Sequence, residues 1–233
     1  MKKNNIAAIL MISIAFLSCK KDKKSPVGLL GPNFANVINS IVTPAILDSL
    51  KKGGLPINPG LTPANIDGIY LLSPDYCIYD NTNTYVGSTF SDELEKFSNQ
   101  NTEAYSVAYA YNQGDGSEVG VDNRATYISG TGNLFTVYAQ ALDTLDGVPS
   151  VDLRVMSGEL TTGGIKNLYQ GVYIVSKGND PNGDVAPIGT TRVVKDGDGF
   201  SQTEATFSIS PVKIQTARNK RPLQMTIGAA GKH

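Results

Sequence analysis

Histidine and tryptophan are almost missing from this chain of 233 residues. It contains no Trp, and its one His is His233, at the last position. Ser-His-Asp catalysis, Cys-His catalysis and His-rich zinc sites all need an imidazole held in a fixed place. Because chain ends are usually mobile, we do not expect His233 to serve in such a site. The sequence therefore predicts no catalytic residue, no metal site and no cofactor, and it does not favour an enzyme.

Cysteine and excess charge are also scarce. Cys19 and Cys77 are the two cysteines, so modification of Cys19 would leave no intramolecular disulfide. We expect Cys77 to pack as a small hydrophobic residue. The chain has 20 basic and 21 acidic residues. Without a broad basic surface, a nucleic-acid partner is not expected.

One apolar run stands near the start of the chain. It extends from Ile6 to Leu17, has 12 residues and follows Lys2 and Lys3. A membrane-spanning helix needs about 20 residues, whereas a basic start and a short apolar segment are typical of a secretory signal peptide. The sequence therefore predicts a removed signal peptide over residues 1–18.

The run ends in Phe16-Leu17-Ser18-Cys19, which resembles the lipobox of bacterial lipoproteins, with Phe16 where Leu is preferred. The resemblance implies that Cys19 becomes the first mature residue and carries a diacylglycerol and an amide-linked acyl chain, such as palmitate. Several acyl chains together anchor a protein firmly to a membrane. Lys20, rather than Asp, after the cysteine implies the outer membrane of a cell envelope. An ordinary signal peptide cut elsewhere is the alternative.

Composition divides the rest of the chain into three parts. Residues 19–32 are basic, then rich in Gly and Pro, and are expected to form a lipidated tether. Residues 33–65 hold two short amphipathic helices, capped at Asn33 and Thr43, and a boundary loop. We expect these helices to close one end of the fold. Residues 66–233 are expected to form a β domain.

Nine strands separated by Gly, Asn, Asp or Pro are predicted within the β domain. They lie near residues 67–73, 84–92, 104–112, 118–129, 134–143, 150–160, 168–177, 188–194 and 204–210, and the stretch 91–100 is either a short helix or a strand. Successive strands with short connections favour antiparallel neighbours. The predicted fold is an antiparallel up-and-down barrel of eight to nine strands, or a two-sheet sandwich, preceded by the two short helices.

A further resemblance concerns the first predicted strand. Gly68-Ile69-Tyr70 resembles the Gly-x-Trp of lipocalins, with Tyr in place of Trp. The resemblance implies a lipocalin-like barrel that holds a small ligand, in which Arg192, near the last barrel strand, packs on the ring of Tyr70. The chain departs from that family in having no Trp and in its helical prelude.

Tyrosines mark the candidate ligand site. Tyr105, Val107, Tyr109 and Tyr111 stand at alternate positions, so they share one face of a predicted strand. An amphipathic ring suits a partly polar ligand, although the same face equally suits a packed core. The sequence thus predicts a domain that binds a small hydrophobic or amphipathic molecule at these four residues.

Two other functions remain open. An adaptor lipoprotein that docks on a cell-envelope protein would expose an apolar patch. A glycan hydrolase would bring two carboxylates together in a cleft, but the densest acidic group, Asp92, Glu93 and Glu95, is interpreted as a solvated face.

Two acidic motifs have the clustered oxygens that calcium prefers. They are Asp180-x-Asn182-x-Asp184 and Asp196-x-Asp198-Gly199. Neither has the Glu that ends an EF-hand loop, and Asp, Asn and Gly are also turn residues. We therefore expect both motifs to be turns.

Overall fold

The computed structural model of this protein describes residues 30–113, 119–121, 125–145 and 147–208. The predicted signal peptide, the lipid-attachment residue Cys19 and nearly all of the predicted tether lie outside these residues. The end of the last predicted strand and His233 lie outside them as well.

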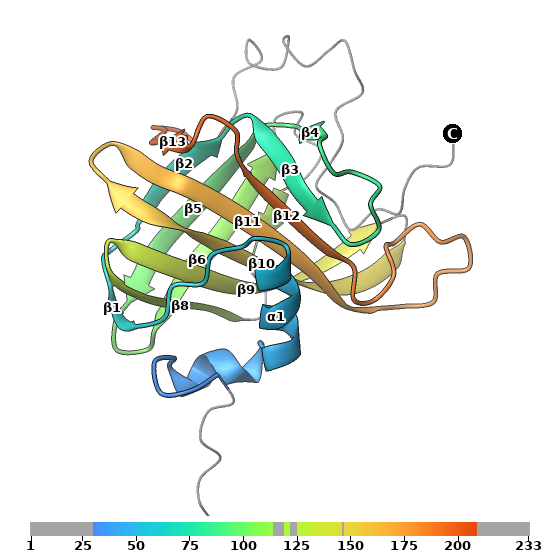
Figure 1. Ribbon diagram of the computed structural model, residues 1–233, viewed down its shortest axis with the longest axis horizontal. Coiled ribbons are helices and arrows are strands. Elements are labelled where there is room, and N and C mark those ends of the chain that lie inside the picture. Colours follow the sequence, from blue (N-terminus) through green and yellow to red (C-terminus); the bar gives the residue numbers. More distant parts are fainter. Residues whose placement is uncertain (1–29, 114–118, 122–124, 146, 209–233) are drawn as a thin grey trace, which may run out of the picture.

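The described residues are mainly β, and their strands form one curled, barrel-like sheet (Figure 1). Along its main path the order is β2-β5-β6-β8-β9-β10-β11-β12-β3-β4, while β1, β7 and β13 attach to β8, β6 and β11. Every pair is antiparallel except β1 with β8. The strands are β1 (Leu61–Pro63), β2 (Gly68–Leu72), β3 (Asp75–Asp80), β4 (Thr89–Phe90), β5 (Glu93–Asn101), β6 (Ser106–Gln113), β7 (Val119–Val121), β8 (Ala125–Gly132), β9 (Leu134–Leu145), β10 (Val148–Thr161), β11 (Gly164–Lys177), β12 (Thr191–Asp196) and β13 (Phe200–Gln202).

The prediction of a mainly β, antiparallel fold is confirmed, while its details differ. The main path has ten strands in one sheet, where the sequence predicts eight to nine strands or two sheets. The ambiguous stretch 91–100 is a strand, β5, and the sequence pattern misses β3 altogether. Within the predicted strand 84–92 only β4 forms, and residues 204–208 belong to no strand.

The curl of the sheet brings its first strand back to its middle. β13 pairs with the start of β11, and Thr203, directly after β13, forms a β-bridge with Tyr70 of β2. Glu204 N also donates a hydrogen bond to Ile69 O at 2.8 Å. These backbone bonds join β2 to β11 through β13, so the sheet encloses an interior face.

Helix α1 (Pro44–Lys52) begins where the sequence predicts it. Thr43 Oγ1 accepts a hydrogen bond from Ile46 N at 3.4 Å, and Pro44 takes the first helical position. The first predicted helix is instead a five-residue 3-10 helix, η1 (Asn36–Ser40), preceded by Ala35 rather than capped by Asn33.

α1 covers the outer face of the sheet, so the expectation that it closes one end is wrong (Figure 1). Leu50 of α1 is fully buried beside β11, where a Cβ on Gly171 would lie 2.6 Å from Leu50 Cδ2. Leu153 and Val155 of β10 point to the same outer core. Because these strands carry apolar side chains on both faces, they need cover on the outside as well as the inside.

The interior face carries a second, larger core. Its apolar side chains include Phe97, Tyr109, Phe135, Met156 and Leu168, all nearly inaccessible to solvent. The Phe97 ring stacks on Tyr109 at a centroid distance of 5.7 Å and meets Phe135 edge-on at 6.2 Å. This apolar packing surrounds the polar residues described next.

Candidate functional site

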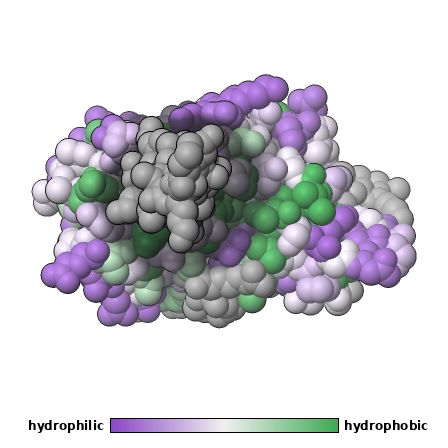
Figure 2. Space-filling model, turned by 90° about the horizontal axis from the view of Figure 1, so that it is seen from below, coloured by the Kyte–Doolittle hydropathy of each residue, from purple (hydrophilic) through white to green (hydrophobic). Residues whose placement is uncertain are grey.

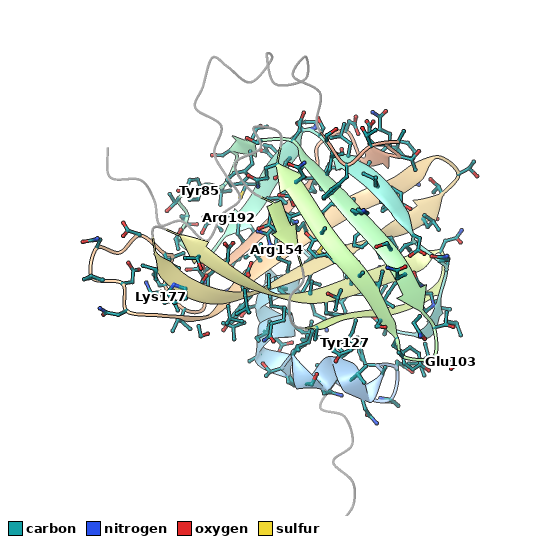
Figure 3. All side chains as sticks on the ribbon, turned by 180° about the vertical axis from the view of Figure 1, so that it is seen from behind. Tyr85, Glu103, Tyr127, Arg154, Lys177 and Arg192 are labelled. Carbon is teal, nitrogen blue, oxygen red and sulfur yellow. The ribbon has the colours of Figure 1, made fainter. Side chains whose placement is uncertain are left out.

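Seven polar side chains gather on the interior face, and each has 0 % exposure. They are Asp75 of β3, Glu93 and Glu95 of β5, Gln113 of β6, Asp152 and Arg154 of β10, and Gln170 of β11. We call them the acid–amide cluster. They point inward because alternate residues of a strand share a face. In Figure 3, Arg154 lies near the middle of the curled sheet, whereas Glu103 and Tyr127 lie towards its lower edge.

Two glutamines tie the two glutamates together. Gln170 Nε2 donates hydrogen bonds to Glu93 Oε1 at 2.7 Å and to Glu95 Oε1 at 2.6 Å. Gln113 Nε2 donates to Glu93 Oε2 at 2.9 Å. Glu93 Oε1 also lies 3.7 Å from Arg154 Nη1. The Glu93 carboxylate is therefore contacted by two amide donors and a guanidinium, which together stabilise its negative charge.

Arg154 is held between an acid and an aromatic ring. Its Nε donates to Asp152 Oδ2 at 3.3 Å, and its Cζ lies 3.6 Å from the ring centroid of Tyr111. A guanidinium stacked on a tyrosine face is attracted by the ring electrons, more strongly when both are desolvated. These contacts fix the position of the one cation in the cluster.

Burial raises the pKa of three other carboxyl groups of the cluster. Burial raises the pKa of Asp75 well above its usual value, and the charges of Glu93, Asp92 and Asp196 add to this. Burial, then the charge of Glu93, raises the pKa of Glu95 likewise. Burial raises the pKa of Asp152 to about 6, although Arg154 opposes the shift. The single guanidinium does not compensate this many buried acids.

The cluster also has more hydrogen-bond acceptors than donors. Six of its side-chain oxygens have no hydrogen-bond partner among the described residues: both carboxyl oxygens of Asp75, Glu95 Oε2, Gln113 Oε1, Asp152 Oδ1 and Gln170 Oε1. Buried polar atoms are nearly always paired in folded proteins. A group of unpaired acceptors in one place therefore marks this cluster as the candidate functional site.

The structure separates the four predicted ligand-binding residues. Val107, Tyr109 and Tyr111 lie on β6 and belong to the interior core, each 3 % exposed. Tyr105 precedes the strand with φ of +52°, and it packs against the outer core instead. The left-handed backbone at Tyr105 breaks the alternation on which the shared face depends. Binding at these residues stays a prediction.

Tyr109 and Tyr111 border the acid–amide cluster. Burial raises the pKa of the Tyr109 hydroxyl, and the neighbouring Glu95 carboxylate adds to the shift. The two rings stack at a centroid distance of 6.1 Å, and Tyr111 also carries Arg154. The sequence pattern thus finds the aromatic border of the cluster but not its acids.

Glu93 and Glu95 are buried, so their interpretation as a solvated face is wrong. The error arises because Glu93, Glu95 and Phe97 alternate inward along β5, so acids occupy positions where an apolar pattern is expected. The one sequence signal that marks them is this spacing of two, in register with Gln113, Tyr111 and Tyr109 of β6.

Arg192 contacts other rings than the lipocalin resemblance implies. Its Cζ lies 4.4 Å from the ring centroid of Tyr85, and its Nε donates to Asp80 Oδ2 at 3.2 Å (Figure 3). Tyr70 packs on Phe97 at 6.1 Å, and its hydroxyl donates to Ile66 O. The expected packing of Arg192 on Tyr70 is therefore wrong.

Both acidic motifs form turns. Asp180 Oδ1 and Oδ2 accept hydrogen bonds from Asp184 N and Val185 N, and Asp180 pairs with Lys177 at 2.7 Å. Asp198 Oδ1 accepts from Phe200 N. A polar cleft of about 160 Å³ lies at the second motif and is bordered by Asn167, Tyr169 and residues 195–199. Over the described part of the chain, no group of three or more His, Cys, Asp or Glu is placed to hold a metal ion.

Apolar residues on the surface are spread over the molecule. Figure 2 shows one face, seen from below, on which green apolar groups lie between purple polar ones. The large exposed hydrophobic residues are Val37, Leu61, Tyr76, Val86, Leu134, Leu142, Ile188 and Phe200. They belong to different elements and loops, so docking on an envelope partner stays a prediction.

Searches against models of protein families, curated proteins and solved structures found no match for this chain. Within the described residues, no helix has the length and apolar character that crossing a bilayer requires.

Proposed function

We propose that this protein is an exported lipoprotein, anchored to the outer membrane through acylated Cys19, whose β domain binds a small amphipathic molecule. The observation that carries the binding proposal is the acid–amide cluster, with its six unpaired buried acceptors beside an apolar interior. A molecule with donors at one end and hydrocarbon at the other complements both parts.

The aromatic border of the cluster supports an amphipathic ligand. On β6, Tyr109 lies opposite Phe97 of the apolar core, and Tyr111 lies between Tyr109 and the polar end of the strand at Gln113. Tyrosine rings suit a ligand that is partly polar, because each has an apolar face and a polar tip. The polar end of the ligand would bind at Glu95, and its apolar part would pack beside Tyr109.

The anchor proposal rests on the sequence and is tested by intact-mass analysis. The protein purified from its own membranes should have a mass that begins at Cys19 and includes acyl chains. A Cys19→Ala version should lose the acyl mass and leave the membrane fraction. A product cut elsewhere and without acyl chains would refute the anchor.

The binding proposal is tested on the same membrane-purified protein by non-denaturing mass spectrometry. A small molecule released on denaturation should be present in the wild-type protein and absent from a Tyr109→Leu variant. Tyr173→Leu is the matched control, because Tyr173 packs on the outer face. Absence of any released molecule, with no shift in melting temperature on adding amphiphiles, would refute ligand binding and leave the adaptor alternative.

A further inference from the structure

The acid–amide cluster has a strongly unequal charge balance. Asp75, Glu93, Glu95 and Asp152 contribute four carboxyl groups, and Arg154 contributes the single cation of the cluster. The contacts of Glu93 with two amides and Arg154 stabilise one negative charge. Asp152 pairs with Arg154 at 3.3 Å. Isolated charges are too costly to bury, so Asp75 and Glu95 hold protons unless another cation replaces them.

The unpaired atoms agree with this charge balance. The six oxygens belong to carboxyl or amide groups and come from β3, β5, β6, β10 and β11, while the Tyr109 hydroxyl beside Glu95 supplies one further donor. A carboxyl proton donates one hydrogen bond, whereas an alkylammonium group carries three N–H donors and a positive charge. A primary ammonium therefore matches both the missing donors and the missing charge.

From this balance we infer that the ligand is an amphipathic primary amine, whose ammonium group binds at Glu95 within the acid–amide cluster and displaces a proton. This inference rests on the proposed binding function and names its ligand class. In the step, the ammonium keeps its three protons, one carboxyl group ionises, and its proton leaves to solvent. Charge balances because one cation enters the cluster as one proton departs.

The groups that face the binding carboxylates come from every strand around them. Asp92, Glu93 and Tyr109 lie on or beside β5 and β6, Asp152 and Arg154 lie on β10, and Asp196 lies on β12. All of these groups are acids except Arg154. Their charges disfavour a second anion unless a cation accompanies it, so proton release and ammonium binding are linked.

The test is calorimetric titration of the full chain carrying Cys19→Ala, which avoids acyl chains and the detergent they require. The probes are octylammonium, octanol and octanoate, which share a chain and differ in charge. Each titration is repeated in buffers of different ionisation enthalpy, so that the number of protons released can be measured. Octylammonium should bind and release about one proton. Its affinity should rise as the pH is raised towards neutrality, because protons compete with it for the carboxylate.

Variants locate the ammonium site. Glu95→Gln keeps the side-chain volume and should weaken octylammonium about tenfold and abolish proton release, since a charged hydrogen bond is lost. Asp75→Asn removes the other carboxyl group of the cluster that burial keeps protonated, should weaken octylammonium binding as well, and serves as a second variant if Glu95→Gln folds poorly. Asp48→Asn, on the exposed face of α1, is the matched control and should change neither quantity.

Each outcome has a distinct meaning. Binding of octanol or octanoate without octylammonium would overturn the amine inference and keep the proposed ligand-binding function. Binding of none of the three probes would count against both. Octylammonium binding that is unchanged in Glu95→Gln and Asp75→Asn, or an equal response to calcium chloride, would also overturn the inference.

Discussion

Raising the pH should destabilise this domain over a range in which most proteins are insensitive or become more stable. Burial raises the pKa of Asp152 from 3.8 to about 6 in the folded protein. The folded state therefore retains a proton that the unfolded chain has already lost between these pH values. Stability is fully present below the unfolded pKa and is lost as the pH rises through the folded pKa.

The size of the effect follows from the pKa shift. A shift of one unit corresponds to about 1.4 kcal/mol, so Asp152 alone should remove about 2–3 kcal/mol of unfolding free energy between about pH 4 and pH 7. Asp75 and Glu95 act in the same direction, because burial raises their pKa values as well.

The assay is urea unfolding, followed by circular dichroism, of the wild-type chain and Asp152→Asn between about pH 4 and pH 8. The variant keeps an oxygen for Arg154 but does not ionise. Relative to the wild type, the unfolding free energy of the variant should gain about 2–3 kcal/mol on going from the acidic to the neutral end. The difference in unfolding free energy between the variant and the wild type at a single pH is less informative, because it includes the altered bond to Arg154.

A second variant, for which the opposite pH dependence of stability is expected, completes the experiment. Hydrogen bonds from Lys177 lower the pKa of Asp180, so its contribution to stability is lost as the pH falls. Asp180→Asn should therefore differ from the wild type in the opposite direction. Parallel curves for the wild type and Asp152→Asn would refute the reasoning, as would a wild type that becomes steadily more stable from acid to neutral pH.

Three further predictions concern the packing around the sheet. Gly171→Ala should destabilise by about 1–3 kcal/mol in urea unfolding, because its Cβ would lie 2.6 Å from Leu50 Cδ2, and Leu50→Ala in the same chain should relieve part of that loss. Arg192→Lys should cost about 1–2 kcal/mol, since lysine keeps the charge but not the planar stacking on Tyr85, and a double-mutant cycle with Tyr85→Leu that gives no coupling would contradict this. Cys77 has 0 % exposure, and burial raises the pKa of its thiol to about 11. In the Cys19→Ala chain a thiol reagent should therefore react with Cys77 only after unfolding. Rapid reaction of the native protein would be evidence against the fold.

The parts of the fold that the sequence predicts are those where local patterns agree with the final structure. β9, β10 and β11 are long, rich in β-branched and aromatic residues and joined by short turns, and their ranges are close to prediction. The start of α1 is similarly marked by Thr43 and Pro44. These signals lie within a few residues of the elements they specify.

The remaining features depend on partners that are distant in the sequence. β5 has acids at inward positions, so its apolar alternation is incomplete until β6 pairs with it. α1 covers the outer face of strands more than 100 residues away. The only trace of this packing in the strand sequence is Gly171, which leaves room for Leu50. A local pattern cannot indicate which face of a sheet a helix will cover.

The candidate site divides in the same way. Tyr109 and Tyr111 are visible as an alternating pair, and two of the four predicted residues thus border the cluster. Glu93, Asp152 and Gln170 come from three strands and become one group only when the sheet curls. Their individual sequence contexts resemble those of surface residues, since acids and amides are mostly exposed in folded proteins.

The acid–amide cluster opposes stability, and this opposition offers a last test of its role. Neighbouring inward positions on the same strands hold Phe97, Val107 and Met156, so an apolar residue at position 95 would suit the interior core. Buried charged groups can often be replaced by apolar residues of similar volume with a gain of about 1–4 kcal/mol. Glu95→Met should therefore raise the unfolding free energy at neutral pH, measured by urea unfolding, and should abolish octylammonium binding. A variant that loses stability would show that Glu95 is needed by the fold itself, whereas a stabilised variant that no longer binds would show that the acid is retained at a cost, for the ligand.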